Sequence, residues 1–258
     1  MVNVENLEKL PKKIYFGDAG YSDWYNFPLG FSEKGPLSWN VLKDGASLLV
    51  SGKRGSGKTT MAGNLIQHAN TNADRWNVVL LNPEPYNHHE PLVEGLKNEK
   101  YFSDFFQCSE MLKTSVDHLH KRLGLIEDAD ESSYLDYKPA AHAILIVIDS
   151  ADKIFIVDEN DSEEIQELKN RNAMNLWAIS RQGRQAGVFI ALMSDKSERD
   201  STSTYGGIIE GLHVDFEKPE DLSSEDWPCG RATIEQFGIV DVAQTYSQKF
   251  FEHKEIFD

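Results

Sequence analysis

Cysteine, basic residues and long apolar segments are all scarce in this sequence. Only Cys108 and Cys229 occur among 258 residues, which is too few for a disulfide framework and favours a reducing compartment. The longest clean apolar run, Ala143 to Ile148, is far too short to cross a bilayer. Residues 1–13 contain no continuous apolar segment of the kind that signal peptides carry. We therefore expect a soluble, cytoplasmic chain that buries its core without covalent crosslinks.

Acidic residues outnumber basic residues in this sequence. There are 26 Lys and Arg against 42 Asp and Glu, which gives a formal net charge of −16 and a pI near 4.9. A continuous basic groove for nucleic acid is therefore not expected. A ring motor that touches a polymer through a few residues per subunit stays compatible with this charge, but a protein substrate suits it better.

A complete phosphate-binding motif (Walker A) follows the apolar segment 47–51. The spacing G-x-x-x-x-G-K-T is filled by Gly52, Lys53, Arg54, Gly55, Ser56, Gly57, Lys58 and Thr59, and Thr60 follows it. The glycines let the backbone curl and direct its N–H groups at a polyphosphate, and a helix beginning near Lys58 adds its N-terminal amides. Lys58 is predicted to contact the β- and γ-phosphates of ATP, and Thr59 to bind Mg²⁺. We predict that these nine residues bind the nucleotide.

A second part of a nucleotide site is predicted at Asp149. This residue follows the apolar, largely β-branched run 143–148, which is typical of a strand buried on both faces of a parallel sheet. There it would help to hold Mg²⁺. A rival, Asp158 with Glu159, follows the shorter run 154–157, which comes too soon after the first run for a crossover between parallel strands. We favour Asp149 and interpret the rival as loop acids.

Strand and helix patterns alternate along the chain. Apolar runs predict strands at 47–51, 77–82, 143–149 and 187–193, with short ones at 212–216, 231–234 and 239–242. Helical spacing predicts helices at 60–69, 110–125 and 162–182, the last capped by Ser162. This order indicates an α/β fold with a mostly parallel, doubly wound sheet and helices on both faces, as in RecA-like P-loop NTPases.

Other segments carry weaker signals. Residues 1–45 are rich in aromatics and are predicted to form an N-terminal lead-in with little regular structure, packed on a P-loop domain of residues 46–258. Within it, residues 37–41 alternate between apolar and polar side chains as in a strand. Cys108 is expected at the end of a buried strand that includes Phe105 and Phe106, and residues 127–137 are expected to form an exposed loop. We interpret His88 and His89 as loop residues rather than a metal site, because no ligand cluster follows them.

Several motifs together resemble the FtsK/HerA superfamily of ring-forming P-loop motors. The segment Phe27–Glu33, the approach 44–52 to the phosphate loop, the R-Q-G-R-Q-A-G run at 181–187 and the W-P-C-G-R-A turn at 227–232 are all similar to its motifs. The resemblance covers roughly residues 27–245. Within this superfamily, the resemblance is strongest to the FtsK/SpoIIIE-like ATPase modules of the type VII secretion coupling proteins EssC and EccC.

One departure from that family affects catalysis. Active motors of the family carry Asp-Glu after the strand, whereas this chain has Asp149-Ser150, and a serine does not accept a proton as a carboxylate does. Asp152 is the nearest substitute, and the family's sensor glutamine would fall near Asp195. Arg181 and Arg184 are candidates for an arginine finger that acts on a neighbour's γ-phosphate. The resemblance therefore implies nucleotide binding, and leaves hydrolysis weak or missing.

The resemblance also implies a place in the cell. The chain would be one of several neighbouring ATPase modules in a longer chain or ring, in the cytoplasmic part of a membrane-anchored protein. It would couple nucleotide binding to the export of helical secreted protein substrates. The alternatives are a ring motor that translocates or packages double-stranded DNA, which the charge disfavours, and a catalytically inactive nucleotide-binding scaffold.

Overall fold

A computed structural model describes Leu10, Ile14, residues 23–83 and 99–195, Tyr205, residues 208–217, Trp227, and residues 230–236 and 239–247. The expectations for His88, His89 and Cys229 lie outside these residues. The strands in chain order are β1 (Asn26–Ser32), β2 (Gly35–Asn40), β3 (Ser47–Ser51), β4 (Trp76–Leu81), β5 (Glu99–Phe102), β6 (Ala143–Ile148), β7 (Val188–Ser194), β8 (Gly211–Asp215), β9 (Arg231–Gln236) and β10 (Ile239–Thr245). The helices are α1 (Lys58–Thr71), α3 (Phe105–Asp128), α4 (Tyr134–Tyr137), α5 (Ala151–Phe155) and α6 (Glu163–Ala186).

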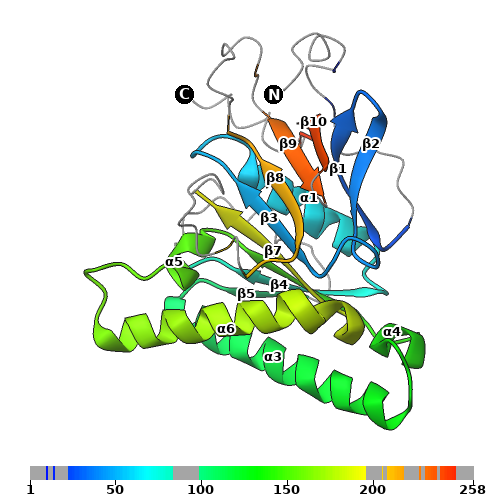
Figure 1. The fold of residues 1–258 in the computed structure, drawn as a ribbon, viewed down its shortest axis with the longest axis vertical. Coiled ribbons are helices and arrows are strands. Elements are labelled where there is room, and N and C mark those ends of the chain that lie inside the picture. Colours follow the sequence, from blue (N-terminus) through cyan, green and yellow to red (C-terminus); the bar gives the residue numbers. More distant parts are fainter. Residues whose placement is uncertain are drawn as a thin grey trace.

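These strands form a single mixed sheet in the order β2-β1-β10-β9-β8-β3-β7-β6-β4-β5 (Figure 1). The six strands from β8 to β5 are parallel, and β9, β10, β1 and β2 extend the sheet in antiparallel fashion. Parallel neighbours need crossover connections, and helix α6 supplies the one between β6 and β7. The predicted mostly parallel α/β sheet is confirmed.

Helices cover both faces of the parallel strands, as predicted. Alternate side chains of β3 divide between the two cores: Leu48 and Val50 pack with α1, whereas Leu49 packs with α3, α5 and α6. The long helices α3 and α6 run side by side across one face, and α1 lies on the other (Figure 1). The central strands are therefore shielded on both sides, and only their ends are open to a ligand.

The region before residue 45 is more regular than expected. The expectation of little regular structure is wrong for residues 26–40, which form the hairpin β1–β2 and join the same sheet through β10. The strand-like alternation at 37–41 did indicate most of β2. Its aromatic side chains explain why: Phe27 and Trp39 are fully buried, and the Phe27 ring lies 5.1 Å from that of Trp76 in β4. Aromatic burial outweighs the turn signals around the hairpin. The division of the chain at residue 45 stays a prediction.

Three further segments differ from the sequence expectations. Phe105 and Phe106 begin helix α3 rather than a strand, because the Asp104 side chain accepts hydrogen bonds from the amides of Phe106 and Gln107 and caps the helix. Cys108 is buried as expected, but in that helix, and burial raises the pKa of its thiol to about 12. The expected loop 127–137 contains the short helix α4, and strand β5 was not anticipated.

The described residues contain no helix that is both long enough and apolar enough to span a bilayer.

Helix α6 contains a glycine that only close packing explains. A Cβ added at Gly183 would lie 2.1 Å from the carbonyl oxygen of Val188 and 3.0 Å from the Cβ of Ala46. We therefore expect Gly183→Ala to lower the free energy of unfolding by about 1–3 kcal/mol, although alanine favours helices. Urea unfolding followed by circular dichroism measures this change.

Gly124 in α3 is the matched control, because a Cβ there meets no atom within 4 Å. Gly124→Ala is expected to raise the free energy of unfolding by about 0.5–1 kcal/mol. Equal effects of the two substitutions would contradict the packing argument.

Candidate functional site at the carboxyl ends of the strands

The predicted site residues gather where the parallel strands end. Strand β3 lies between β7 and β8, with Ser51 in register with Ser194 and with Asp215. Strand β6 is the next neighbour beyond β7, so Asp149 follows its end about 10 Å from the end of β3, or two strand spacings. The carboxyl edge of an α/β sheet is the usual place for a ligand. The topology therefore brings the phosphate loop, Asp149 and the end of β7 to one edge.

The phosphate loop has the backbone shape that its glycines allow. Gly52, Gly55 and Gly57 have φ angles of 145°, 80° and 123°, which side chains rarely tolerate. A Cβ at Gly52 would also come within 2.7 Å of the Cβ of Phe216, which follows β8. At Gly55 a Cβ would meet nothing within 4 Å, so this turn faces open space. The loop is thus packed from below by Phe216 and open above.

Helix α1 begins at Lys58 without the capping groups that the other long helices have. Its N-cap is Gly57, which makes no side-chain capping hydrogen bond, and its first turn contains no acid. By contrast, Asp104 caps α3 and Ser162 caps α6, as predicted for Ser162. The amides of a first helical turn lack partners within the helix and carry partial positive charge. At α1 they suit an anion, and the surrounding loop fits the phosphates of a nucleotide.

The ammonium group of Lys58 is buried within the loop. Its Nζ donates to the carbonyl oxygens of Gly52 at 2.6 Å and Lys53 at 3.0 Å. It also forms an ion pair with Asp195, at 2.7 Å from Oδ1. The lysine side chain is 9 % exposed and that of Asp195 is 71 % exposed. Lys58 is therefore held at the position from which it would reach a phosphate, by two backbone carbonyl oxygens and one exposed carboxylate.

Asp149 and Ser150 form a tight turn between β6 and α5. The amide of Asp149 donates to the carbonyl oxygen of Leu81, which fixes the turn against the end of β4. Ser150 adopts a left-handed conformation with φ 56° and is the N-cap of α5. Such a conformation costs a non-glycine residue about 1–2 kcal/mol, and strained residues of this kind concentrate at functional sites.

A carboxylate at the start of α5 links this turn to the end of β7. Asp152 Oδ1 accepts hydrogen bonds from Ser194 Oγ at 2.6 Å and from the hydroxyl of Tyr205 at 3.0 Å. Its Oδ2 accepts from the amide of Asp195 at 2.8 Å. Asp152 therefore positions the residue that contacts Lys58. Its predicted role as a substitute base stays a prediction, and three donors already occupy its oxygens.

Sequence reasoning did not identify Tyr205. Its ring is buried and packs edge-on against Phe155 of α5, with 6.1 Å between ring centroids. Burial, together with the nearby charge of Asp152, raises the pKa of its hydroxyl far above the usual value, so the group stays protonated and donates. No spacing rule connects residues 152 and 205, because only the folded chain brings them together.

A second polar group supports the base of the phosphate loop. The Ser51 hydroxyl donates to Asp215 Oδ1 at 3.0 Å and lies 2.9 Å from Nε2 of His213. Because the carboxylate accepts the serine proton, the imidazole does not act as its base, and Ser51 is fully buried. The arrangement differs from that of a hydrolase triad. It joins the ends of β3 and β8 beneath the loop.

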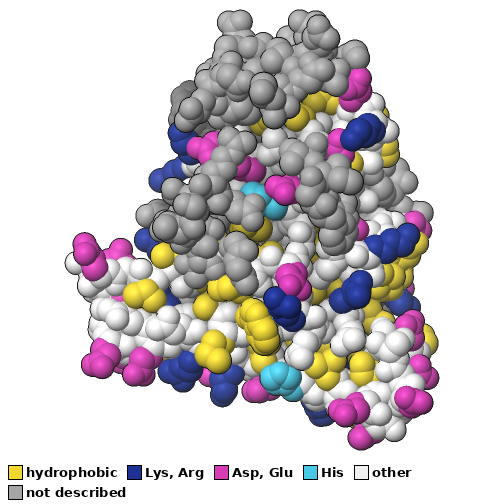
Figure 2. Space-filling view, in the orientation of Figure 1, with side chains coloured by type: hydrophobic (Ala, Val, Ile, Leu, Met, Phe, Trp, Pro, Cys, Tyr) yellow, Lys and Arg dark blue, Asp and Glu magenta, His cyan; other side chains and the backbone are white. Residues whose placement is uncertain are grey.

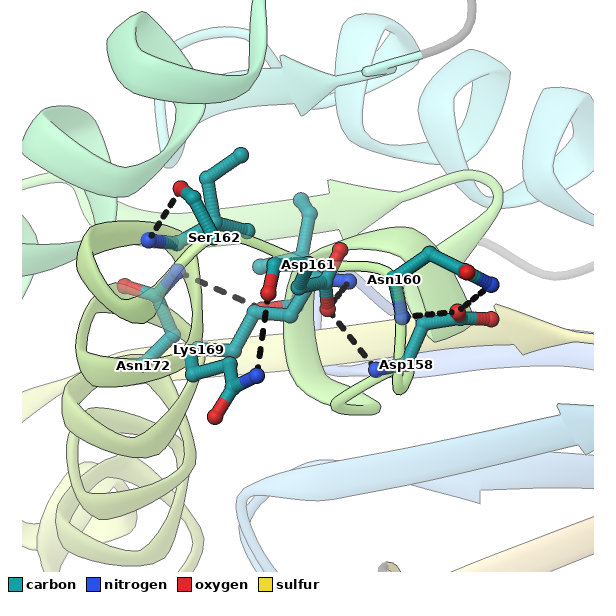
Figure 3. Close-up of polar contacts among 9 residues, drawn as sticks. Asp158, Asn160, Asp161, Ser162, Lys169 and Asn172 are labelled. Atoms are coloured by element: carbon teal, nitrogen blue, oxygen red, sulfur yellow. Dashed lines mark hydrogen bonds and ion pairs between the residues drawn. The ribbon is translucent and has the colours of Figure 1, made fainter.

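The rival acids after residue 154 lie away from the strand ends, in a loop between α5 and α6. The run 154–157 begins inside helix α5 and is not a strand. Asp158 accepts hydrogen bonds from the amide and side chain of Asn160, which lower the pKa of its carboxyl (Figure 3). Asp161 accepts from the buried Lys169 at 2.7 Å, which anchors this loop to α6. The interpretation of Asp158 and Glu159 as loop acids agrees with this placement.

The two candidate arginine fingers lie near the amino ends of the parallel strands, away from the phosphate loop. Arg181 and Arg184 are in the last turns of α6, which leads directly into the start of β7. A seven-residue strand separates them from the phosphate loop by about 20 Å. Arg181 pairs with Glu210 at 2.7 Å and lies over the ring of Trp177. Neither arginine can therefore reach a nucleotide in its own loop, and either would act only on a neighbouring subunit.

Metal binding depends on few protein ligands. Among the described residues no group of three or more His, Cys, Asp or Glu could hold a metal ion. Thr59, at the start of α1, and Asp149 are the predicted Mg²⁺ ligands. Magnesium in a phosphate loop is held by one or two protein groups, the phosphates and water, so this sparse set fits it.

The Asp152 network gives a stability prediction. Asp152→Ala would leave the buried Tyr205 hydroxyl without its acceptor, and we expect a loss of about 2 kcal/mol in the free energy of unfolding. Tyr205→Phe should cost about 1 kcal/mol. The double variant should cost about 1 kcal/mol less than the sum, because the two residues share one interaction. Chemical denaturation of the four proteins measures the cycle, and simple additivity would contradict the bond.

Comparison with known proteins finds solved structures that share this fold. No protein-family model matches the chain, and no curated protein matches its sequence. Among solved structures, the monomeric pCW3 conjugation coupling protein TcpA with ATPγS aligns with a TM-score of 0.79 and 14 % identity, over 96 % of this chain and 73 % of that one.

Two secretion ATPases are also similar in structure. EssC (ATPases 2 and 3) from Geobacillus thermodenitrificans has a TM-score of 0.70 and 16 % identity, over 92 % of this chain and 47 % of that one. Thermomonospora curvata EccC (ATPases 2 and 3), in complex with a signal sequence peptide, has a TM-score of 0.66 and 14 % identity, over 93 % of this chain and 44 % of that one. The chain thus spans less than half of these two relatives. It has the fold of the FtsK/SpoIIIE-like P-loop ATPase modules found in EssC, EccC and TcpA.

Proposed function

We propose that this chain is an ATP-binding module of the FtsK/SpoIIIE-like type. The observation that carries the proposal is the geometry of the carboxyl edge. A complete phosphate loop, an uncapped helix start and the buried Lys58 lie together there, two strand spacings from Asp149. The likeness in fold to ATPase modules, one of them solved with ATPγS, supports the same assignment.

The roles of the residues follow from their positions. The loop amides and the start of α1 would bind the phosphates, and Lys58 would contact the β- and γ-phosphates. Thr59 and Asp149 would hold Mg²⁺, which neutralises negative charge on the phosphates. Asp152 would keep the end of β7 in place beside the γ-phosphate. Ser150 stands where the family carries the glutamate that activates water, so we expect slow turnover at most.

We further propose that the module acts next to others, in a longer chain or a ring. Arg181 and Arg184 are too far from their own loop, so a catalytic role would require a neighbouring subunit. The exposed apolar residues Met174 and Trp177 lie on the same helix, 72 % and 48 % exposed. An apolar surface beside an arginine finger suits contact with a second ATPase module. Such an assembly would be the cytoplasmic part of a membrane-anchored protein.

For the substrate we propose helical secreted proteins, as in type VII secretion. The signal sequence peptide bound to EccC supports this class of partner. A DNA-translocating motor is the second candidate, and the similarity to a conjugation coupling protein favours it. The charge of −16 counts against DNA, and on the face shown in Figure 2 the Lys and Arg side chains lie scattered among Asp and Glu rather than in a continuous stripe.

Nucleotide binding gives the first test. Lys58→Ala is expected to weaken ATP binding about 10- to 100-fold, because a charge-assisted contact to phosphate contributes about 1.5–3 kcal/mol. Lys121→Ala removes an exposed lysine of α3, away from the loop, and should change affinity less than threefold. Isothermal titration calorimetry measures both, and wild-type protein that binds no ATP at millimolar concentration would refute the proposal.

Turnover separates the candidate functions. Ser150→Glu restores the family's glutamate and is expected to raise the rate of ATP hydrolysis at least tenfold, since a positioned base contributes about 10²–10⁴ in rate. The variant should be stimulated by a helical export substrate more than by duplex DNA. Stimulation by DNA alone would favour the DNA motor. ATP binding without turnover in either protein, with either polymer, would favour the inactive scaffold.

A further inference from the structure

The ammonium group of Lys58 has no donor left for a phosphate. An ammonium carries three N–H donors, and here they face three acceptors: the carbonyl oxygens of Gly52 and Lys53 and the carboxylate of Asp195. The first two acceptors belong to the loop backbone and are fixed by its glycine geometry. Asp195 is a side chain, so it is the acceptor that a phosphate would displace.

Hydrogen bonds fix the backbone of Asp195 beside Lys58. It directly follows β7, and its amide donates to Asp152 Oδ2 at 2.8 Å. Asp152 is in turn held by the hydroxyls of Ser194 and Tyr205. Tyr205 is buried against Phe155, and its own carbonyl oxygen accepts from the amides of Ile208 and Ile209. The backbone of Asp195 is therefore tied to α5 and to the segment before β8, with its carboxylate 2.7 Å from Lys58.

We propose that Asp195 is an internal competitor of the nucleotide phosphates for Lys58, positioned by Asp152 and Tyr205. This proposal rests on the ATP-binding function and concerns the regulation of that site. A carboxylate and a phosphate oxygen both carry negative charge, so they cannot share one ammonium at hydrogen-bond distance without repulsion. Binding of a triphosphate therefore requires Asp195 to leave Lys58, and the ion pair raises the nucleotide concentration at which the loop fills.

The pair is built to open and close again. Asp195 is 71 % exposed, so water solvates its carboxylate once it leaves Lys58. The bond from its amide to Asp152 does not involve the carboxylate and need not break. The apparent affinity for nucleotide is then the intrinsic affinity multiplied by the fraction of molecules in which Lys58 is free. When the nucleotide dissociates, the carboxylate of Asp195 would pair with Lys58 again.

Asp195→Asn tests this competition, because asparagine keeps the size of the side chain and removes the charge. We expect the variant to bind ATP about two- to fivefold more tightly, the range for an ion pair with one exposed partner. The affinity for inorganic tripolyphosphate, which lacks the base and the sugar, should rise by the same factor. Asp117→Asn, on the exposed face of α3, changes the net charge equally and should leave both affinities unchanged. Calorimetric titrations with and without Mg²⁺ give the values.

Three results would overturn the proposal. Unchanged affinity in Asp195→Asn would mean that the pair does not compete. Weaker binding in Mg²⁺ but not in its absence would make Asp195 a metal ligand instead. An equal gain in affinity in Asp117→Asn would show that the effect comes from the net charge of the protein and not from the ion pair.

A second measurement needs no nucleotide and separates this proposal from the proposed function. The side-chain ammonium signal of Lys58 in ¹H–¹⁵N spectra, assigned by its loss in Lys58→Arg, should be visible in the wild type because its protons are held. It should broaden beyond detection in Asp195→Asn. If neither protein binds ATP, the ATP-binding function fails while this signal still decides whether the ion pair exists. Identical signals in both proteins would contradict it.

Discussion

The parallel pairing of β3 with β7 on one side and β8 on the other is the constraint on which the site depends. Every residue of β3 is buried, because α1 covers one face and α6 with α3 covers the other. The strand has no free surface except its ends. Its carboxyl end continues into the phosphate loop, so the position of that loop follows from the packing of the strand. Beneath the loop, Ser51 connects the two strand ends through Asp215.

The same pairing explains why the polar groups of the site come from distant segments. Strands β3, β7, β6 and β8 are separated in the chain by helices of up to 24 residues, yet their ends meet at one edge. Lys58, Asp195 and Asp152 meet there although they lie far apart in sequence. The polar connections run between strands and not along them, so a change at one strand end is transmitted directly to its neighbour.

The antiparallel part of the sheet has a different role. The hairpin β1–β2 extends the sheet through β10, and its buried aromatic residues pack against α1 and β4. Phe27 contacts the ring of His68 in α1, with 4.7 Å between centroids. Burial lowers the pKa of His68, so the imidazole stays neutral in this apolar setting. The C-terminal part of the helix that begins at the phosphate loop thus packs against the N-terminal hairpin.

The sequence by itself determined the phosphate-loop motif and the buried strands that surround it. The spacing from Gly52 to Thr60 and the buried run before Asp149 identify the loop and the strand ends because short-range geometry and burial periodicity require those residue types. The long helix capped by Ser162 was visible for the same reason. These signals are local, so they survive without knowledge of the tertiary structure.

Only the tertiary structure decided which groups meet. Aromatic residues favoured a strand at Phe105, where capping by Asp104 instead starts a helix. The sequence did not reveal strand β1, because its partner β10 lies about 200 residues away. The link from Asp152 to Tyr205, and the ion pair between Lys58 and Asp195, depend on strand order. Strand order is set by long-range packing of the two cores, which no local pattern encodes.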